Sequence, residues 1–146
     1  AVMGQSCGGL QALEVARDDT RIVTIVMLNS GLFADGRALG SMTVKKDDLK
    51  KLRVPIAYFV GGKSDGATVN AEDDYKYLQA PTFKASMEVG HMATYAQPNG
   101  GKFAPAPVAW LKWQLRGDKG AEKMFVGKSC GLCTNAEWTV ESKNFK

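Results

Sequence analysis

The sequence of 146 residues contains few of the side chains and segments that mark several common classes of protein. It has one histidine, His91, and only three cysteines. No apolar run reaches the roughly 18 residues that a membrane-spanning helix needs, so no membrane span is predicted. Its positive charges alternate with acids and are not interleaved with aromatic residues. The net charge of +4 therefore does not predict binding to nucleic acid.

The three cysteines are compatible with few arrangements. Cys130 and Cys133 form a CxxC pair, and Cys7 stands alone. A zinc site would need two further ligands, which only Cys7 and His91 could supply. A redox CxxC pair normally begins a helix after a strand, whereas this pair lies in a glycine-rich tail. We therefore favour a disulfide between Cys130 and Cys133 in an exported protein, with Cys7 either a buried free thiol or paired outside the given sequence.

The length and an apolar content of 45% predict a single globular domain over residues 1–146. Continuous apolar runs at 22–28 and 54–60, rich in β-branched residues, are typical of parallel strands buried on both faces. The segment 82–89 alternates apolar and polar residues instead. This period of two predicts a half-exposed strand near the edge of the sheet.

Helices are predicted between and after these strands: 10–16, a short charged helix ending at Leu52, 71–78, and one from about Pro105 or Pro107 to Leu115. Asp73 and Asp74 are interpreted as acidic charges near the start of their helix. Trp110 and Trp113 are expected to cover the sheet as core residues. The alternation of strands and helices predicts an α/β fold, with a mostly parallel sheet and flanking helices. The tail, 117–146, is expected to be irregular and to carry the CxxC pair.

The first ten residues combine the end of a strand, a glycine-bounded turn and the start of a helix. Gly4, Ser6 and Gly8 fill a G-x-S-x-G pattern. Because glycine has no Cβ, Gly4 and Gly8 permit a sharp, strained strand-to-helix turn with a serine at its tip. The serine hydroxyl then projects into solvent at a helix N-terminus, whose free N–H groups favour negative charge. The pattern is short, so its interpretation depends on what lies downstream.

An acid and a histidine follow in the chain, each just beyond a predicted strand. Ligands bind at the carboxyl ends of strands in open parallel sheets, where Ser6, Asp65 and His91 are expected to meet. Ser6 would be the nucleophile and His91 its general base, with Asp65 holding the imidazole. Asp35, which follows the strand at 22–28, is the competing acid. An ordinary turn is the alternative interpretation of the segment around Asp65.

The order Ser6, Asp65, His91 resembles that of α/β-hydrolases. The segments GGKSDGA, VGHMATY, NGGKF, WLKWQLRGD and CGLC are similar to those of secreted microbial α/β-hydrolases. The resemblance covers nearly all of the chain and implies the C-terminal portion of that domain, from the nucleophile turn onward. It also implies a missing N-terminal half. One oxyanion-hole donor would be the N–H of Cys7 and the other would come from that half.

The resemblance implies a secreted serine hydrolase that cleaves a carboxylic ester through an acyl-enzyme, with a small-molecule ester or acyl substrate and no metal or organic cofactor. Loss of one oxyanion donor lowers the rate by ~10²–10³, so the isolated chain is expected to be a poor catalyst. Two alternatives stay open. One is a non-catalytic binding module of the same fold. The other is a thiol hydrolase of the dienelactone-hydrolase type with Cys7 as nucleophile, although Gln5 stands where that motif needs glycine.

Overall fold

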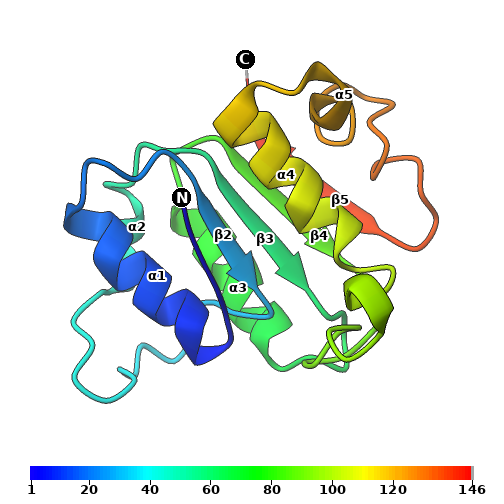
Figure 1. The fold of residues 1–146 in the computed structure, drawn as a ribbon. Coiled ribbons are helices and arrows are strands. Elements are labelled where there is room, and N and C mark those ends of the chain that lie inside the picture. Colours follow the sequence, from blue (N-terminus) through cyan, green and yellow to red (C-terminus); the bar gives the residue numbers. More distant parts are fainter. Residues whose placement is uncertain (146) are drawn as a thin grey trace.

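A computed structural model describes residues 1–145 as one five-stranded sheet with helices on both faces (Figure 1). The elements follow along the chain as β1 (Val2–Gln5), α1 (Cys7–Asp18), β2 (Ile25–Leu28), α2 (Lys46–Leu49), β3 (Ile56–Val60), α3 (Ala67–Tyr77), β4 (Thr82–Ser86), the 3-10 helix η1 (Pro98–Gly100), α4 (Pro105–Arg116), α5 (Lys119–Glu122) and β5 (Thr139–Lys143). The strands lie in chain order, with β1 to β4 parallel and β5 antiparallel to β4. The predicted α/β class with a mostly parallel sheet is confirmed.

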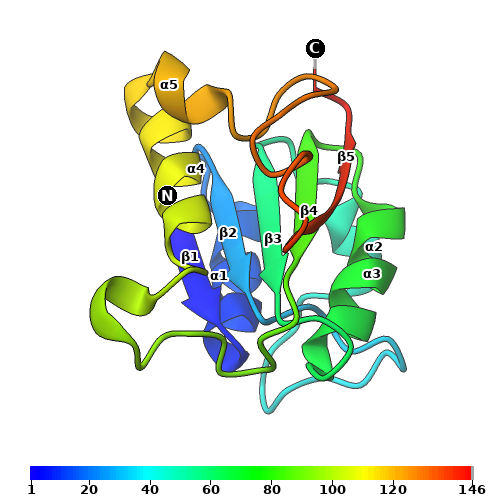
Figure 2. The same cartoon turned by 90° about the vertical axis from the view of Figure 1, so that its right-hand side faces the viewer.

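Two apolar layers cover the two faces of the sheet, and Figure 2 shows α3 and α4 on opposite sides of it. Leu13 of α1, Leu49 of α2 and Ala71 of α3 pack against one face. Trp110 of α4 is fully buried against the other, where Trp113 and the α5 segment join it. Since β2 and β3 are covered from both sides, all of their residues are buried, as their apolar runs predict.

The prediction of a half-exposed strand near the sheet edge at 82–89 is right in the presence of a strand next to the edge and wrong in its exposure. β4 ends at Ser86, and its outer edge is paired with β5, Ala85 lying opposite Val140. Lys84, one of the polar residues in that alternation, is only 7% exposed and forms an ion pair with Glu141 at 2.7 Å. The segment 117–146, expected to be irregular, therefore supplies both α5 and the strand that completes the sheet.

The predicted disulfide between Cys130 and Cys133 is confirmed. Cys130 and the neighbouring Leu132 are buried in the α4 layer, so this turn packs the chain between α5 and β5 against the core. Cys7, by contrast, is exposed, and the expectation of a buried thiol is wrong. No helix within residues 1–145 has both the length and the apolarity needed to cross a membrane.

Candidate active site

A sharp turn at Ser6 joins β1 to α1. Ser6 has φ 52° and ψ −121°, a backbone conformation that is strained for any residue with a side chain. The turn is held from the side of β2, because the Ser6 N–H donates to the Leu28 carbonyl and Ser30 Oγ donates to the Ser6 carbonyl at 2.6 Å. The predicted strand, turn and helix are therefore present, with the N-terminus of α1 directly after the serine.

Only one of the two glycines of the pattern is needed to avoid crowding, although the sequence predicts this for both. A Cβ on Gly4 would lie 2.1 Å from the carbonyl carbon of Gly8, so the close approach of strand and helix requires Gly4. A Cβ on Gly8 would meet nothing within 4 Å. The second demanding position is Gly9, where a Cβ would lie 2.4 Å from Ser30 Oγ. The prediction of crowding is right for Gly4 and wrong for Gly8.

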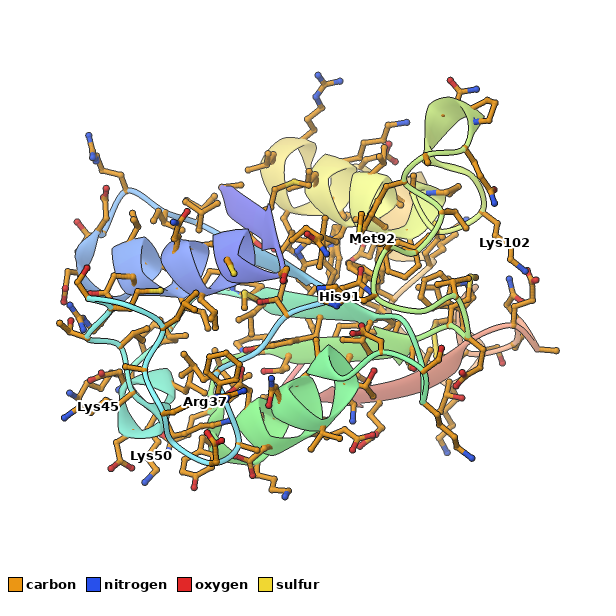
Figure 3. The ribbon with its side chains drawn as sticks, turned by 90° about the horizontal axis from the view of Figure 1, so that it is seen from below. Arg37, Lys45, Lys50, His91, Met92 and Lys102 are labelled. Carbon is orange, nitrogen blue, oxygen red and sulfur yellow. A yellow bond between two sulfur atoms is a disulfide. The ribbon has the colours of Figure 1, made fainter. Side chains whose placement is uncertain are left out.

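Ser6, His91 and Asp65 are joined by two hydrogen-bonding contacts. Ser6 Oγ lies 3.0 Å from His91 Nε2, and His91 Nδ1 lies 2.8 Å from Asp65 Oδ1. The three residues follow β1, β3 and β4, so the carboxyl edge of the sheet brings them together. In Figure 3, which views this edge, His91 lies near the centre, between α1 and α3. The side chain of His91 is 43% exposed and that of Asp65 is fully buried.

The Asp65 carboxylate accepts hydrogen bonds at both of its oxygens. Asn29 Nδ2 and the Gly61 N–H donate to Oδ2 at 2.9 and 3.0 Å, and the Ala67 N–H donates to Oδ1 at 2.9 Å. Burial raises the pKa of this carboxyl, but the hydrogen bonds, that of Asn29 foremost, outweigh burial and lower the pKa overall. Asp65 is therefore ionised at neutral pH and can stabilise a positive charge on the adjacent imidazole.

Two residues behind Asp65 were missed by the sequence analysis. Asn29 is fully buried with φ 45°, and Tyr95 donates its hydroxyl hydrogen to Asn29 Oδ1. Asn29-Ser30-Gly31 has the composition of an ordinary turn, which hid its role. The available signal was its place, since an amide at the carboxyl end of a central parallel strand lies where ligands bind.

Gln5, the residue before the serine, also contacts the histidine. Its Nε2 lies 3.2 Å from the His91 carbonyl oxygen, to which it donates, and 3.4 Å from His91 Nε2. The strand that carries the serine therefore also positions the loop that carries the imidazole.

A pocket of about 540 Å³ opens beside Ser6 and His91. Phe33, Asp35 and Arg37, from the segment after β2, line one side of it. The Arg37 guanidinium lies over the Phe33 ring, 4.2 Å from its centroid, and forms an ion pair with Asp35 at 3.5 Å. Asp35, the competing acid, is therefore paired with Arg37, whereas the imidazole is paired with Asp65.

A buried carboxylate in α3 holds the start of this pocket-lining segment. α3 begins one turn earlier than predicted, so Asp73 and Asp74 lie in its middle and are not charges at its start. Asp74 Oδ2 accepts hydrogen bonds from the Leu32 N–H at 2.9 Å and the Tyr58 hydroxyl at 3.1 Å, and Oδ1 pairs with Lys46 Nζ at 2.7 Å. Burial raises the pKa of Asp74 to about 6, although Lys46 acts in the opposite direction.

The other end of the segment is held by α1. Glu14 accepts hydrogen bonds from the backbone N–H groups of Thr43 and Val44 at 3.0 and 2.7 Å, and from the Thr43 hydroxyl at 2.7 Å. These hydrogen bonds lower the pKa of Glu14. Both ends of the pocket-lining segment, Leu32 and Thr43, are thus hydrogen-bonded to helices that pack directly on the sheet.

Within residues 1–145, no group of three or more His, Cys, Asp or Glu side chains is placed to hold a metal ion. Neither a scan of protein-family models nor a search of curated proteins finds a match to the chain. The interpretation of the site therefore rests on its geometry and chemistry.

Proposed function

We propose that this chain belongs to the α/β-hydrolase superfamily and carries the active site of a serine hydrolase that cleaves carboxylic esters. The observation that supports this most is the continuous contact from Ser6 Oγ through His91 to Asp65, at 3.0 and 2.8 Å. The strained turn at Ser6 and the adjacent pocket add to it. Each of the three side chains is of the type, and has the neighbour, that nucleophilic acyl transfer uses.

In this mechanism Ser6 Oγ attacks the acyl carbonyl carbon while its proton passes to His91 Nε2. The resulting tetrahedral intermediate collapses when the imidazolium gives that proton to the departing alcohol, which leaves an acyl group on Ser6. Water then attacks the acyl-enzyme with His91 again as the base. Asp65 stays ionised throughout, and it holds the imidazole with Nε2 toward the serine.

The negative charge that develops on the carbonyl oxygen needs a hydrogen-bond donor. Cys7 is the first residue of α1, so its N–H has no acceptor within the helix and lies at the positive end of the helix dipole. We assign this N–H as one donor of the oxyanion hole. The pocket beside Ser6, lined by Phe33 and Leu10, would receive an apolar part of the ester.

A thiol hydrolase with Cys7 as nucleophile is the second candidate, because Cys7 is exposed and lines the same pocket. The serine is favoured because His91 Nε2 contacts Ser6 Oγ. We also propose that the protein is exported, since a disulfide such as Cys130–Cys133 persists in oxidising compartments.

Labelling with a fluorophosphonate probe, together with hydrolysis of p-nitrophenyl acetate, tests the proposal. Wild-type protein should be labelled once, and Ser6→Ala should lose both the label and the hydrolysis. Ser41→Ala, which removes an exposed serine outside the pocket, is the matched control and should behave as wild type.

Two results would contradict the assignment. If Cys7→Ala abolishes hydrolysis while Ser6→Ala keeps it, the nucleophile is the thiol. If Ser6→Ala keeps both the label and the hydrolysis at the wild-type level, Ser6 is not the nucleophile and the serine-hydrolase assignment is wrong.

A further inference from the structure

We infer that Asn29 and Tyr95 are positioning residues, which lock the Asp65 carboxylate in the orientation that holds His91. This inference rests on the proposed function, because positioning affects a reaction only if these side chains carry one out. Its structural part can be measured separately from catalysis.

Asn29 lies where it can connect the loops that carry the reacting groups. It follows β2, which is flanked by β1 and β3, and its N–H donates to the Phe59 carbonyl at 2.8 Å. Its Nδ2 donates to Asp65 Oδ2 at 2.9 Å and to the carbonyl oxygen of Gly90 at 3.2 Å. Gly90 directly precedes His91, so one buried amide holds the acid and the histidine loop together.

The chemistry of the partners determines which way the amide points. A carboxylate and a backbone carbonyl can only accept hydrogen bonds, so both must face the NH₂ end of Asn29, which has two hydrogens to give. The amide oxygen then faces Tyr95 and can only accept, which makes the tyrosine hydroxyl the donor. Rotation of the amide would place its oxygen against the carboxylate of Asp65.

Tyr95 is suited to act as a permanent donor. Burial, and after it the negative charge of Asp65, raise the pKa of its hydroxyl, so the hydroxyl keeps its proton. Its ring packs edge-on against Phe103 with the centroids 5.8 Å apart, which holds the hydroxyl in place. The side chain of Tyr95 does not need to touch a substrate to have this effect, since it acts through Asn29.

When the Asn29 amide is held in this orientation, the two oxygens of Asp65 have different hydrogen-bond partners. Oδ2 is occupied by Asn29 and the Gly61 N–H, and Oδ1 is left for His91 and the Ala67 N–H. Of the described residues, the titratable side chains that face this carboxylate are His91 and, beyond Asn29, Tyr95. Loosening Asn29 would let the carboxylate rotate and would weaken its hold on the imidazole.

Tyr95→Phe removes the hydroxyl that donates to Asn29 Oδ1 and keeps the aromatic ring. We expect kcat for ester hydrolysis to fall about threefold to tenfold with KM unchanged, the usual effect of losing one neutral hydrogen bond. Tyr77→Phe is the matched control, because Tyr77 lies in α3 on the other layer of the sheet and should leave kcat as in wild type.

Asn29→Asp supplies a readout that a purely structural role would not change. At low pH the carboxyl group that this substitution introduces is protonated and can still donate to Asp65, but two carboxylates at this distance repel each other once both ionise. The activity of this variant relative to wild type should therefore fall progressively as the pH rises. A ratio that does not change with pH would overturn the inference.

The effect of Tyr95 on the hydrogen bond between Asp65 and His91 can also be observed without catalytic turnover. His91 is the single histidine, so the far-downfield proton resonance of an imidazole Nδ1–H bonded to a carboxylate has one possible source. In a Ser6→Ala background, Tyr95→Phe should broaden or shift this resonance, and Tyr77→Phe should leave it in place. If Tyr95→Phe changes neither the resonance nor kcat, the inference is wrong. If the resonance responds but Ser6→Ala hydrolyses the ester as fast as wild type does, the proposed function fails and the positioning stands.

Discussion

Alanine at Gly4 should destabilise the protein, whereas alanine at Gly8 should not, although both glycines belong to one G-x-S-x-G pattern. A Cβ on Gly4 would lie 2.1 and 2.2 Å from the carbonyl carbon and oxygen of Gly8, and 2.6 Å from the backbone nitrogen of Gly9. All three are backbone atoms at the start of α1, so no side-chain rotation can relieve the clash. Only a shift of the helix against β1 would make room.

Overpacking of a well-packed site costs about 1–3 kcal/mol, and a clash with backbone belongs at the upper end of that range. At Gly8 the added methyl group points into open space. Alanine there favours the helix by about 0.5–1 kcal/mol, because glycine loses more backbone entropy on folding. The two substitutions should therefore change the unfolding free energy in opposite directions.

Urea denaturation and thermal melting would measure the difference. With about 2–4 °C per kcal/mol for a chain of this size, Gly4→Ala should lower Tm by up to about 12 °C and Gly8→Ala should raise it slightly. Ester hydrolysis should survive Gly8→Ala and fall in Gly4→Ala, since the clash displaces the turn that carries Ser6. If both variants melt together, at the wild-type temperature or below it, the reasoning about this turn is refuted.

Three further predictions concern the carboxylates and the disulfide. Asp65→Asn should lower kcat by about 10⁴, because an amide favours the wrong imidazole tautomer, and steady-state kinetics on a folded variant would show this. The raised pKa of Asp74 means that the native state holds this proton more tightly than the unfolded chain, so its contribution to stability is complete below pH 3.8 and is lost as the pH rises through about 6. Relative to Asp74→Asn, wild type should therefore lose up to about 3 kcal/mol of unfolding free energy across that window, because the carboxyls with lowered pKa, such as Glu14 and Asp65, act alike in both proteins. Parallel slopes for the two proteins in urea titrations would contradict this. Cys133→Ser opens the short disulfide loop at an exposed position and should lower the free energy of unfolding by about 2 kcal/mol, measured as a fall in Tm. Added reductant should lower the Tm of wild type by the same amount and should leave the Tm of the variant unchanged.

The features that could be predicted from the sequence are those decided by nearby residues. The apolar runs containing Ile25–Leu28 and Ile56–Val60 are short and rich in β-branched residues, which favours buried strands, and the glycines around Ser6 indicate a tight turn before a helix. That Asp65 and His91 approach Ser6 also follows from the pattern, because loops after parallel strands leave the sheet at the same edge.

The features that were missed depend on contacts between distant segments. Thr139–Lys143 is polar and becomes a strand only because β4 offers it a free edge. The buried position of Asp74 depends on Leu32 and Tyr58, neither of which is close to it in sequence. Asn29 has the local appearance of a turn residue, and its partners come from the loops after the next two strands. Such long-range contacts leave no periodicity in the chain.

The segment 32–43, which lines the pocket, is held at both of its ends by helices, so its middle can vary more freely than its ends. Leu32 is hydrogen-bonded to α3 and Thr43 to α1, and between them Phe33, Leu39 and Met42 pack partly against the core. Substitutions at the exposed positions 34–38 should therefore change the pocket without disturbing the sheet or the residues at its edge. Such substitutions would alter the shape of the pocket and leave Ser6, Asp65 and His91 where they are. Under the proposed function, the residues that select the ester would therefore be separate from the residues that cleave it.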